Sequence, residues 1–249
     1  MTLIIDLGNS RLKWARLGQQ SDGSKGAIEH GGRLSETTLK QLGGDGPAPQ
    51  AVVCAAVASQ DLIDSLTDFC ARVWGIDVEY VLSSDRFLGL VNSYQQPERL
   101  GVDRWLAMLA ARRIIDGWFC LIDAGTAITV DLVDAQGQHH GGWIMPGENL
   151  MHRSLIEHTG RIKTEPALVD AAWGVSTADA VALGTQAAVA GLVAEAQRKV
   201  MDFATERPQF VVTGGCGSRI IEYLNGPVML VPDLVLDGLA LWVREMHND

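Results

Sequence analysis

The chain carries two copies of a short acidic turn that could hold a phosphorylated ligand. Asp6-Leu7-Gly8-Asn9 follows the apolar run Leu3-Ile4-Ile5, and Asp123-Ala124-Gly125-Thr126 follows Cys120-Leu121-Ile122. An acidic residue at the end of a buried strand, followed by glycine, places a carboxylate beside backbone N–H groups that can approach an anion closely. One such turn is usually no more than a tight turn, but two copies favour a site that holds a nucleotide's phosphates and its metal from both sides.

Further polar side chains follow each turn. Lys13 lies on the strand that leaves the first turn, where a lysine can offset phosphate charge while Asp6 holds Mg²⁺ through water. In the second copy, the hydroxyl of Thr126 follows the glycine directly and can hydrogen-bond a phosphate oxygen. Thr129 stays undecided, because threonine is also simply a good strand former.

The densest polar group comprises Tyr94, Pro97, Gly101, Asp103 and Arg104. One interpretation makes Asp103 a helix-start residue stabilised by the helix dipole, with Arg104 in solvent. The other is catalytic. An aspartate at a helix N-terminus should stay ionised, which suits phosphoryl transfer, where the carboxylate orients a hydroxyl and takes its proton late. The residues alone leave both interpretations open.

The apolar periodicity predicts the elements that position these groups. In the first half we expect a hairpin, a third strand with a short helix, and then a β-α-β segment whose strands pair in parallel. Loops rich in Gly, Ser, Asp and Pro are expected at 19–26 and 43–50. The predicted elements are strands Leu3–Asp6, Arg11–Leu17, Ala51–Ala56 and Val78–Leu82, and helices Gln60–Trp74 and Gly101–Ile115, the latter with Trp105, Leu106, Leu109 and Ile114 on one side.

The second half repeats the plan of strand, hairpin and α/β units. Strands are expected at Cys120–Asp123, Ala127–Val133, Gln138–Ile144, Phe210–Thr213 and Val228–Leu230, with a long helix from Ser176 to Phe203, capped by Ser176 or Thr177, and a final helix from Leu234. The prediction is therefore an α/β protein of two related halves, residues 1–116 and 117–249, with a cleft between them. The loop Thr213–Gly217 leads into a helix and could face an anion or a nucleoside.

Composition limits the function classes. The 249 residues include 20 basic and 30 acidic side chains, a formal charge of −10, which argues against broad binding to nucleic acid or to an anionic membrane. The N-terminal apolar stretch breaks too early for a signal peptide or a membrane span, so we expect a cytoplasmic protein. The four cysteines lack zinc-ligand spacing and are expected to be reduced and mostly buried.

These motifs together resemble the type III pantothenate kinases, within the acetate and sugar kinase, chaperone and actin superfamily. The resemblance runs nearly end to end. It rests on Asp6–Asn9 with Lys13, Tyr94 with Pro97, Gly101–Arg104, Asp123–Ala127 with Asp131, Gly142–Gly147 and Trp173–Thr177. The fold that it implies is actin-like, with two duplicated ribonuclease H-like halves.

The resemblance implies ATP-dependent phosphorylation of pantothenate to 4′-phosphopantothenate, the first step of coenzyme A biosynthesis, with Asp103 as general base. The implied residues for ATP and its phosphates are Asp6, Gly8, Asn9, Lys13, Gly125 and Thr126, and those for pantothenate are Tyr94, Gly101, Val102 and Arg104. It also implies Mg²⁺ held through water by Asp6, and K⁺ or NH₄⁺ held by Asp123. A homodimer is implied, with Thr177 reaching into the partner's pantothenate pocket.

Two rival functions remain at this stage. A kinase of the same superfamily acting on a sugar or a carboxylic acid could use Asp103 equally well, although Tyr94 with Gly101–Arg104 favours pantothenate. A regulatory protein that binds a nucleotide without a small-molecule acceptor belongs to a different class. The negative charge argues against direct DNA binding by such a protein.

Overall fold

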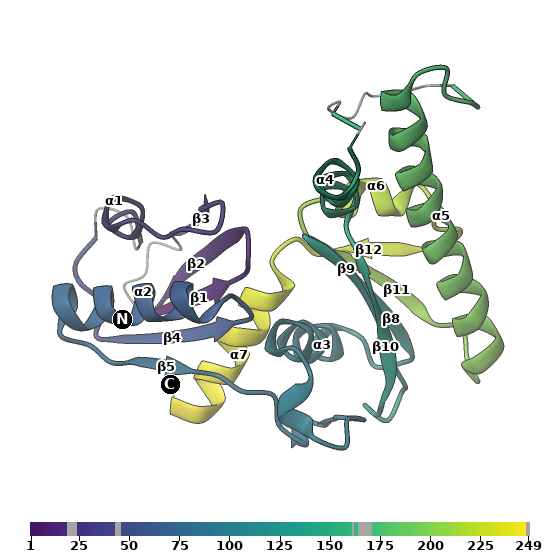
Figure 1. Ribbon diagram of the computed structural model, residues 1–249. Helices are drawn as coiled ribbons and strands as arrows, with labels where there is room; N and C mark the ends of the chain where they lie inside the picture. The colour runs from purple at the N-terminus through teal and green to yellow at the C-terminus, as the bar shows by residue number, and fades with distance from the viewer. Residues whose placement is uncertain (19–23, 43–45, 161, 164–170, 248–249) are drawn as a thin grey trace. The chain divides into compact units, whose positions relative to one another are not determined.

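The computed structural model describes residues 1–18, 24–42, 46–160, 162–163 and 171–247. The chain forms two compact units, one of Met1–Ile114 with Asp233–Asp249 and the other of Ile115–Pro232 (Figure 1). The predicted boundary at 116/117 lies close to the first crossing between the units. The predicted second half differs from the second unit, because it included the C-terminal helix, which packs in the first unit.

The first unit is built on a five-stranded sheet of order β3-β2-β1-β4-β5. β1 pairs antiparallel with β2 and parallel with β4, and β4 pairs parallel with β5, which confirms the predicted β-α-β pairing. The predicted third strand and short helix are β3 and α1. The strands are β1 (Thr2–Leu7), β2 (Arg11–Leu17), β3 (Lys25–Glu29), β4 (Ala51–Ala56) and β5 (Val78–Tyr80). Parts of the predicted loops 19–26 and 43–50 lie outside the described residues.

Helices of the first unit cover its sheet and carry the polar group around Asp103. The predicted helix Gln60–Trp74 is α2 (Gln60–Phe69) followed by a π-helical turn, Cys70–Trp74. A small hairpin of β6 (Arg86–Phe87) and β7 (Leu90–Val91), which the sequence analysis did not predict, precedes the 3-10 turn Pro97–Arg99. The remaining helices are α1 (Glu36–Leu39), α3 (Val102–Ile114) and α7 (Leu234–His247).

The second unit repeats the first sheet strand for strand. Its order is β10-β9-β8-β11-β12, with the same antiparallel hairpins at one edge and parallel pairs at the other. The duplication predicted from the two acidic turns is thus confirmed in the topology. The elements are β8 (Phe119–Ala124), β9 (Ala127–Val133), β10 (His139–Pro146), α4 (Glu148–His158), α5 (Thr177–Phe203), β11 (Gln209–Thr213), α6 (Gly217–Ile221) and β12 (Val228–Leu230).

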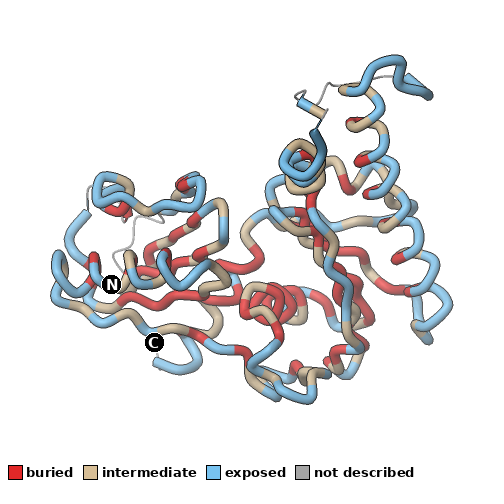
Figure 2. The backbone as a smooth tube through the Cα atoms, viewed as in Figure 1, coloured by how far each residue is buried: buried red, intermediate tan, exposed pale blue. Residues whose placement is uncertain are grey.

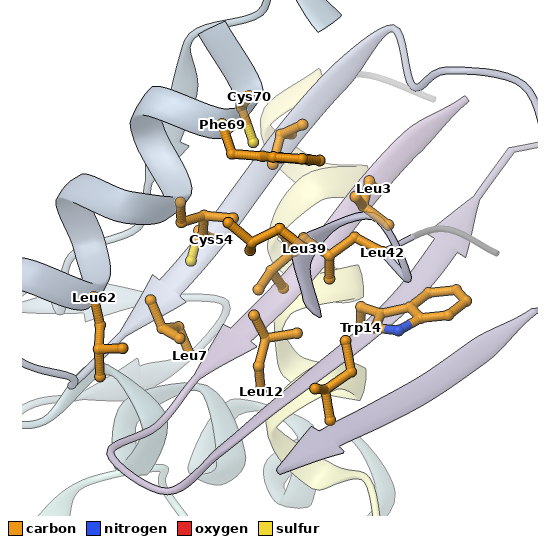
Figure 3. Close-up of a cluster of buried hydrophobic side chains, with 14 residues drawn as sticks. Leu3, Leu7, Leu12, Trp14, Leu39, Leu42, Cys54, Leu62, Phe69 and Cys70 are labelled. Carbon is orange, nitrogen blue, oxygen red and sulfur yellow. The ribbon is translucent and has the colours of Figure 1, made fainter. Parts of the chain in front are cut away.

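Each unit has an apolar core on one face of its sheet. In the first unit alternate residues of β1 and β2, such as Leu7 and Leu12, point with Trp14 toward Phe69 and Leu39 (Figure 3). In the second unit the side chains of Cys120, Ile122 and Ile128 pack with those of α5. The central strands are accordingly buried in both units (Figure 2). Cys54, Cys70 and Cys120 are buried and Cys216 is exposed, all four as free thiols.

The helix that carries Asp103 is buried along most of its length. In α3, Val102 and every residue from Arg104 to Ala111 are buried, whereas Ile114 is exposed, so the predicted one-sided apolar face is wrong. Part of this burial comes from α7, which crosses α3 within the first unit. At the crossing, a Cβ on Gly238 would lie 2.0 Å from the carbonyl oxygen of Leu106, so only glycine fits there. The close approach at Leu106 fixes α3 against α7 within the first unit.

Helix α5 is the one helix among the described residues that is long and apolar enough to cross a membrane, by length and composition only. Its buried side chains, including Val189, Val193 and Val200, belong to the core of the second unit, as those of a core helix do. Ser176 caps it by accepting a hydrogen bond from the Asp179 N–H at 3.1 Å, as one of the two predicted caps.

Candidate active site

The first acidic turn joins β1 to β2 and is braced by neighbouring side chains. The Gly8 N–H donates to the carbonyl oxygen of Arg11 at 3.0 Å, which closes the turn. The Asn9 side chain donates to the carbonyl oxygen of Val57 at 3.1 Å, and His30 Nε2 lies 3.0 Å from the carbonyl oxygen of Gly8. Gly8 therefore shapes the turn through its own N–H. The Gly8 N–H and the side-chain amide of Asn9 both donate to carbonyl oxygens of the protein itself.

Lys13 and Asp6 are direct neighbours across the β1–β2 hairpin, at paired positions. Lys13 Nζ also lies 3.6 Å from Asp233 Oδ1, just before α7, and Lys25 Nζ lies 2.6 Å from Asp233 Oδ2. The hydrogen bond from Lys25 is the main cause that lowers the pKa of Asp233, against a smaller effect of burial, and Lys13 adds to the lowering. Asp233 and Lys25 were not predicted from the sequence, although an aspartate directly before an apolar helix is a recognisable cap signal.

The second acidic turn joins β8 to β9 and is enclosed by two glycines from elsewhere in the unit. The Gly125 N–H closes it by donating to the carbonyl oxygen of Ala127 at 3.0 Å, and the Gly147 N–H donates to the carbonyl oxygen of Thr126 at 2.9 Å. A Cβ on Gly147 would lie 2.6 Å from the carbonyl oxygen of Gly125. Gly147, directly after β10, thus allows the close approach of two backbone segments.

Gly214 packs against the aspartate of the same turn. It has φ +87°, and a Cβ there would lie 2.4 Å from Asp123 Oδ1 and 2.5 Å from the carbonyl oxygen of Ala124. The Cys216 N–H donates to that same carbonyl at 3.0 Å. The loop Thr213–Gly217 is therefore built onto the second turn, a contact that the sequence analysis did not predict.

The polar group around Asp103 forms a connected set in the first unit. Arg104, which is 5% exposed, donates from Nη1 to the Tyr94 hydroxyl at 3.1 Å, and its guanidinium carbon lies 5.9 Å from the centre of the Tyr94 ring. Asp103 Oδ1 accepts from the Arg104 N–H at 2.8 Å. A Cβ on Gly101 would lie 2.6 Å from that oxygen, so Gly101 leaves the room that the carboxylate occupies.

Asn92 holds the segment that delivers Tyr94. Its amide donates to the carbonyl oxygens of Ser84 and Pro97, both at 3.1 Å, and its Oδ1 accepts from the Tyr94 N–H at 2.9 Å. These side-chain hydrogen bonds hold the loop, which has no regular secondary structure to do so. Sequence reasoning overlooked this role, because an isolated asparagine in a loop carries no distinctive signal.

The predicted residues thus fall into three groups. Asp6 pairs with Lys13 in one group, Tyr94 with Gly101–Arg104 in a second, and Asp123 with Gly125 and Thr126 in a third, in the other unit. Thr177 is the first residue of α5. It follows Trp173 and Val175, which are 87% and 98% exposed.

The described residues contain no cluster of three or more His, Cys, Asp or Glu side chains that could hold a metal ion. A cation here would need oxygen ligands from isolated carboxylates, backbone carbonyls, water and a substrate. Asp123 Oδ1 and the Ala124 carbonyl oxygen both lie within 2.5 Å of the position that a Gly214 Cβ would take. The space beside these two oxygens is filled by Gly214 itself. The carboxylates of Asp6 and Asp123, one in each acidic turn, are ligands of the oxygen type that such a cation takes.

Comparison with solved structures gives the class of protein first. A Campylobacter jejuni protein described as a conserved putative Baf family transcriptional activator matches with TM-score 0.63 and 21% identity, over 99% of this chain and all of that one. An archaeal actin homolog matches with TM-score 0.51 and 12% identity, over 100% and 99%. At such identities the likeness concerns the fold, which is the two-unit actin-like fold that the family resemblance implied.

Comparison of sequences gives the family. The model of the type III pantothenate kinases matches residues 2–199. A type III pantothenate kinase of Halorhodospira halophila is 35% identical over 254 residues, covering 98% of both chains. The chain belongs to the type III pantothenate kinases, enzymes that phosphorylate pantothenate with ATP at the entry to coenzyme A biosynthesis, as the motifs predicted.

Proposed function

We propose that Asp103 is the general base of this kinase and that Tyr94 and Arg104 hold pantothenate beside it. The observation that supports this is the connected set at the start of α3, where the buried Arg104 guanidinium contacts Tyr94 and the Asp103 carboxylate occupies the space above Gly101. A buried guanidinium is suited to the carboxylate of pantothenate, which it can bind through two parallel hydrogen bonds.

In this proposal Asp103 orients the primary hydroxyl of pantothenate and accepts its proton late in the transfer. A loose transition state places little demand on the basicity of the carboxylate, so position is its main contribution. Val102 and Gly101 supply backbone at the same site. Because an asparagine amide cannot accept that proton, Asp103→Asn should lose transfer while ATP still binds.

The phosphates would be held by Lys13 and Thr126, with Gly8, Asn9 and Gly125 shaping the two turns. We assign Mg²⁺, held through water, to Asp6, and K⁺ or NH₄⁺ to Asp123 together with the Ala124 carbonyl oxygen. When bound, Mg²⁺ would neutralise charge on the β- and γ-phosphate oxygens.

We also propose a homodimer and a cytoplasmic location. Support for a dimer comes from α5, where an exposed stripe of small residues recurs at helical spacing and follows the exposed Trp173 and Val175. Small residues let two helices approach closely. The stripe consists of Ala180, Gly184, Ala187, Ala188, Gly191 and Ala194. In the dimer, Thr177 would reach the partner's pantothenate pocket.

The experiment is ADP release from the purified protein with ATP, Mg²⁺ and pantothenate, in K⁺ and then in Na⁺ at the same ionic strength. The proposal expects release that requires pantothenate and falls when Na⁺ replaces K⁺. Asp103→Asn should bind ATP normally and lose transfer, and a variant that keeps the full rate would disprove the base assignment. Ala187→Arg, on the exposed stripe, should shift the protein from dimer to monomer in analytical ultracentrifugation.

A further inference from the structure

Lys13 shares a carboxylate with a second lysine at the point where the chain re-enters the first unit. Asp233 is the first residue of the returning segment, after Pro232 ends the second unit. Each of its two carboxylate oxygens lies near a different lysine: Oδ2 is 2.6 Å from Lys25 Nζ, and Oδ1 is 3.6 Å from Lys13 Nζ. Lys25 therefore makes the short contact and Lys13 the long one.

The exposure of the three side chains suits an exchange of partners. The Lys25 side chain is 64% exposed, while those of Lys13 and Asp233 are 24% and 29% exposed. At 3.6 Å the Lys13–Asp233 contact is longer than a normal hydrogen bond, so an incoming polyanion competes with it readily. The short Lys25 contact leaves Asp233 with a cation when Lys13 moves away.

We propose that Asp233 is a positioning residue that competes with the nucleotide phosphates for the ammonium group of Lys13, while Lys25 balances its charge during the exchange. This inference rests on the proposed role of Lys13 as a phosphate ligand. Asp233 then sets how tightly nucleotide is held, and so how readily ADP leaves. Its effect on pantothenate binding is expected to be nil.

The backbone around Asp233 allows a clean substitution. The Asp237 N–H donates to the Asp233 carbonyl oxygen at 2.9 Å, at the beginning of α7. Asparagine is as good a helix cap as aspartate, so Asp233→Asn removes the charge and keeps the helix start. Asp237→Asn is the matched control, because Asp237 is an acidic residue of the first turn of α7 whose charge acts on Asp233 and Lys25.

Substitution of Asp233 and substitution of Lys25 should change nucleotide affinity in opposite directions. For Asp233→Asn we expect the Kd of a fluorescent ADP analogue and the KM for ATP to fall about threefold to fivefold, the range of an exposed ion pair. For Lys25→Met we expect both to rise about twofold, because Asp233 then has Lys13 as its main partner. The KM for pantothenate should stay constant in both.

A double-mutant cycle with Lys13→Met separates competition for the Lys13 ammonium group from general effects of charge. In the Lys13→Met background, Asp233→Asn should change the Kd no more than Asp237→Asn does. Equal effects of Asp233→Asn and Asp237→Asn in the natural background would overturn the proposal, as would an Asp233 effect that persists without Lys13. Because binding of the analogue needs no pantothenate, the cycle still reports on Asp233 if pantothenate-dependent turnover fails.

Discussion

The two acidic turns occupy equivalent places in equivalent sheets, yet they place different residues opposite the aspartate. Asp6 is paired across its hairpin with Lys13, and Asp123 is paired with Thr129. The first turn encloses residues 8–11 between paired positions and the second only residues 125–127, so the second is one residue shorter. The first hairpin carries its own cation, whereas the second offers a neutral hydroxyl at the matching position.

This difference suggests a division of labour between the turns. The first turn is held by side-chain contacts, from its own Asn9 to the Val57 carbonyl and from His30 to the Gly8 carbonyl, and its lysine is shared with Asp233. The second is braced by backbone, through the close approach of Gly147 and Gly214. A turn with a built-in lysine suits a phosphate, and a turn lined by carboxylate and carbonyl oxygens suits a cation from solution.

The largest effect is expected from removal of the cation in the first hairpin. Lys13→Met should lower kcat/KM for ATP about 10²-fold to 10³-fold, the usual loss for one group that stabilises transferring charge. Thr129→Val, at the matching position, should lower it less than about threefold, since a lone hydroxyl in a strand contributes little. Steady-state kinetics with ATP as the varied substrate measures both, and equal losses would contradict the division of labour.

A second test concerns the cation that the second turn would take from solution. Asp123→Asn should reduce activity in K⁺ about 10-fold to 100-fold and remove the difference between K⁺ and Na⁺. Rates are compared in KCl and NaCl at equal ionic strength. Asp6→Asn is the control, whose residual activity should keep the preference for K⁺, and an Asp123→Asn enzyme with that preference would place the cation elsewhere.

The glycines that brace the second turn should matter more for stability than the glycine within the first. Gly214→Ala places a Cβ at φ +87° and 2.4 Å from Asp123 Oδ1, so we expect a loss of about 2–4 kcal/mol in the free energy of unfolding. Gly8→Ala, with its nearest contact at 3.2 Å, should cost less than about 1 kcal/mol. Urea denaturation followed by circular dichroism compares the two, and a reversed order would contradict it.

The smallest effect is expected at the far end of the second hairpin. There His140 Nε2 lies 2.8 Å from Asp134 Oδ2, and the Gln136 and Gln138 N–H groups donate to Asp134 Oδ1. Burial alone raises the pKa of Asp134, but these hydrogen bonds outweigh it and lower the pKa below its ordinary value of 3.8. In the first unit the corresponding strands β2 and β3 are joined by the exposed Arg11–Glu29 ion pair.

A carboxyl group whose pKa is lowered on folding stabilises the folded protein at pH values above its ordinary pKa. This stabilisation is lost as the pH falls through the pKa that the group has in the folded protein. Asp134→Asn should therefore be less stable than the natural chain at neutral pH, and the difference should shrink as the pH falls below 3.8. Melting temperatures across this range measure it. Glu29→Gln is the comparison and should change little at any pH, while a constant difference for Asp134→Asn would exclude the titration.

The sequence predicted well what depends on local pattern. Alternating apolar residues gave the hairpins of both sheets, and the repeated acidic turn indicated the duplication, because strands that leave similar turns pair in similar ways. Tyr94 and Arg104 were also predicted to belong to one site, because both come from one short segment, and their side chains are in contact.

Features that depend on distant contacts escaped prediction. Ile114 was expected in the core but is 53% exposed, whereas Arg104 is buried, because the packing of α3 is decided by elements such as α7 and not by its own periodicity. The return of α7 to the first unit, the brace of Gly214 on Asp123 and the pairing of Lys13 with Asp233 all join segments more than 80 residues apart. No local pattern encodes such partners.

The return of α7 also sets the order in which the chain can be completed during synthesis. The second unit is one uninterrupted insertion, residues 115–232, whereas the first needs α7 to leave the ribosome before Gly238 can pack on Leu106. Domains generally fold as units while the chain emerges. The inserted unit is thus able to fold first, and the unit that it interrupts is completed after it.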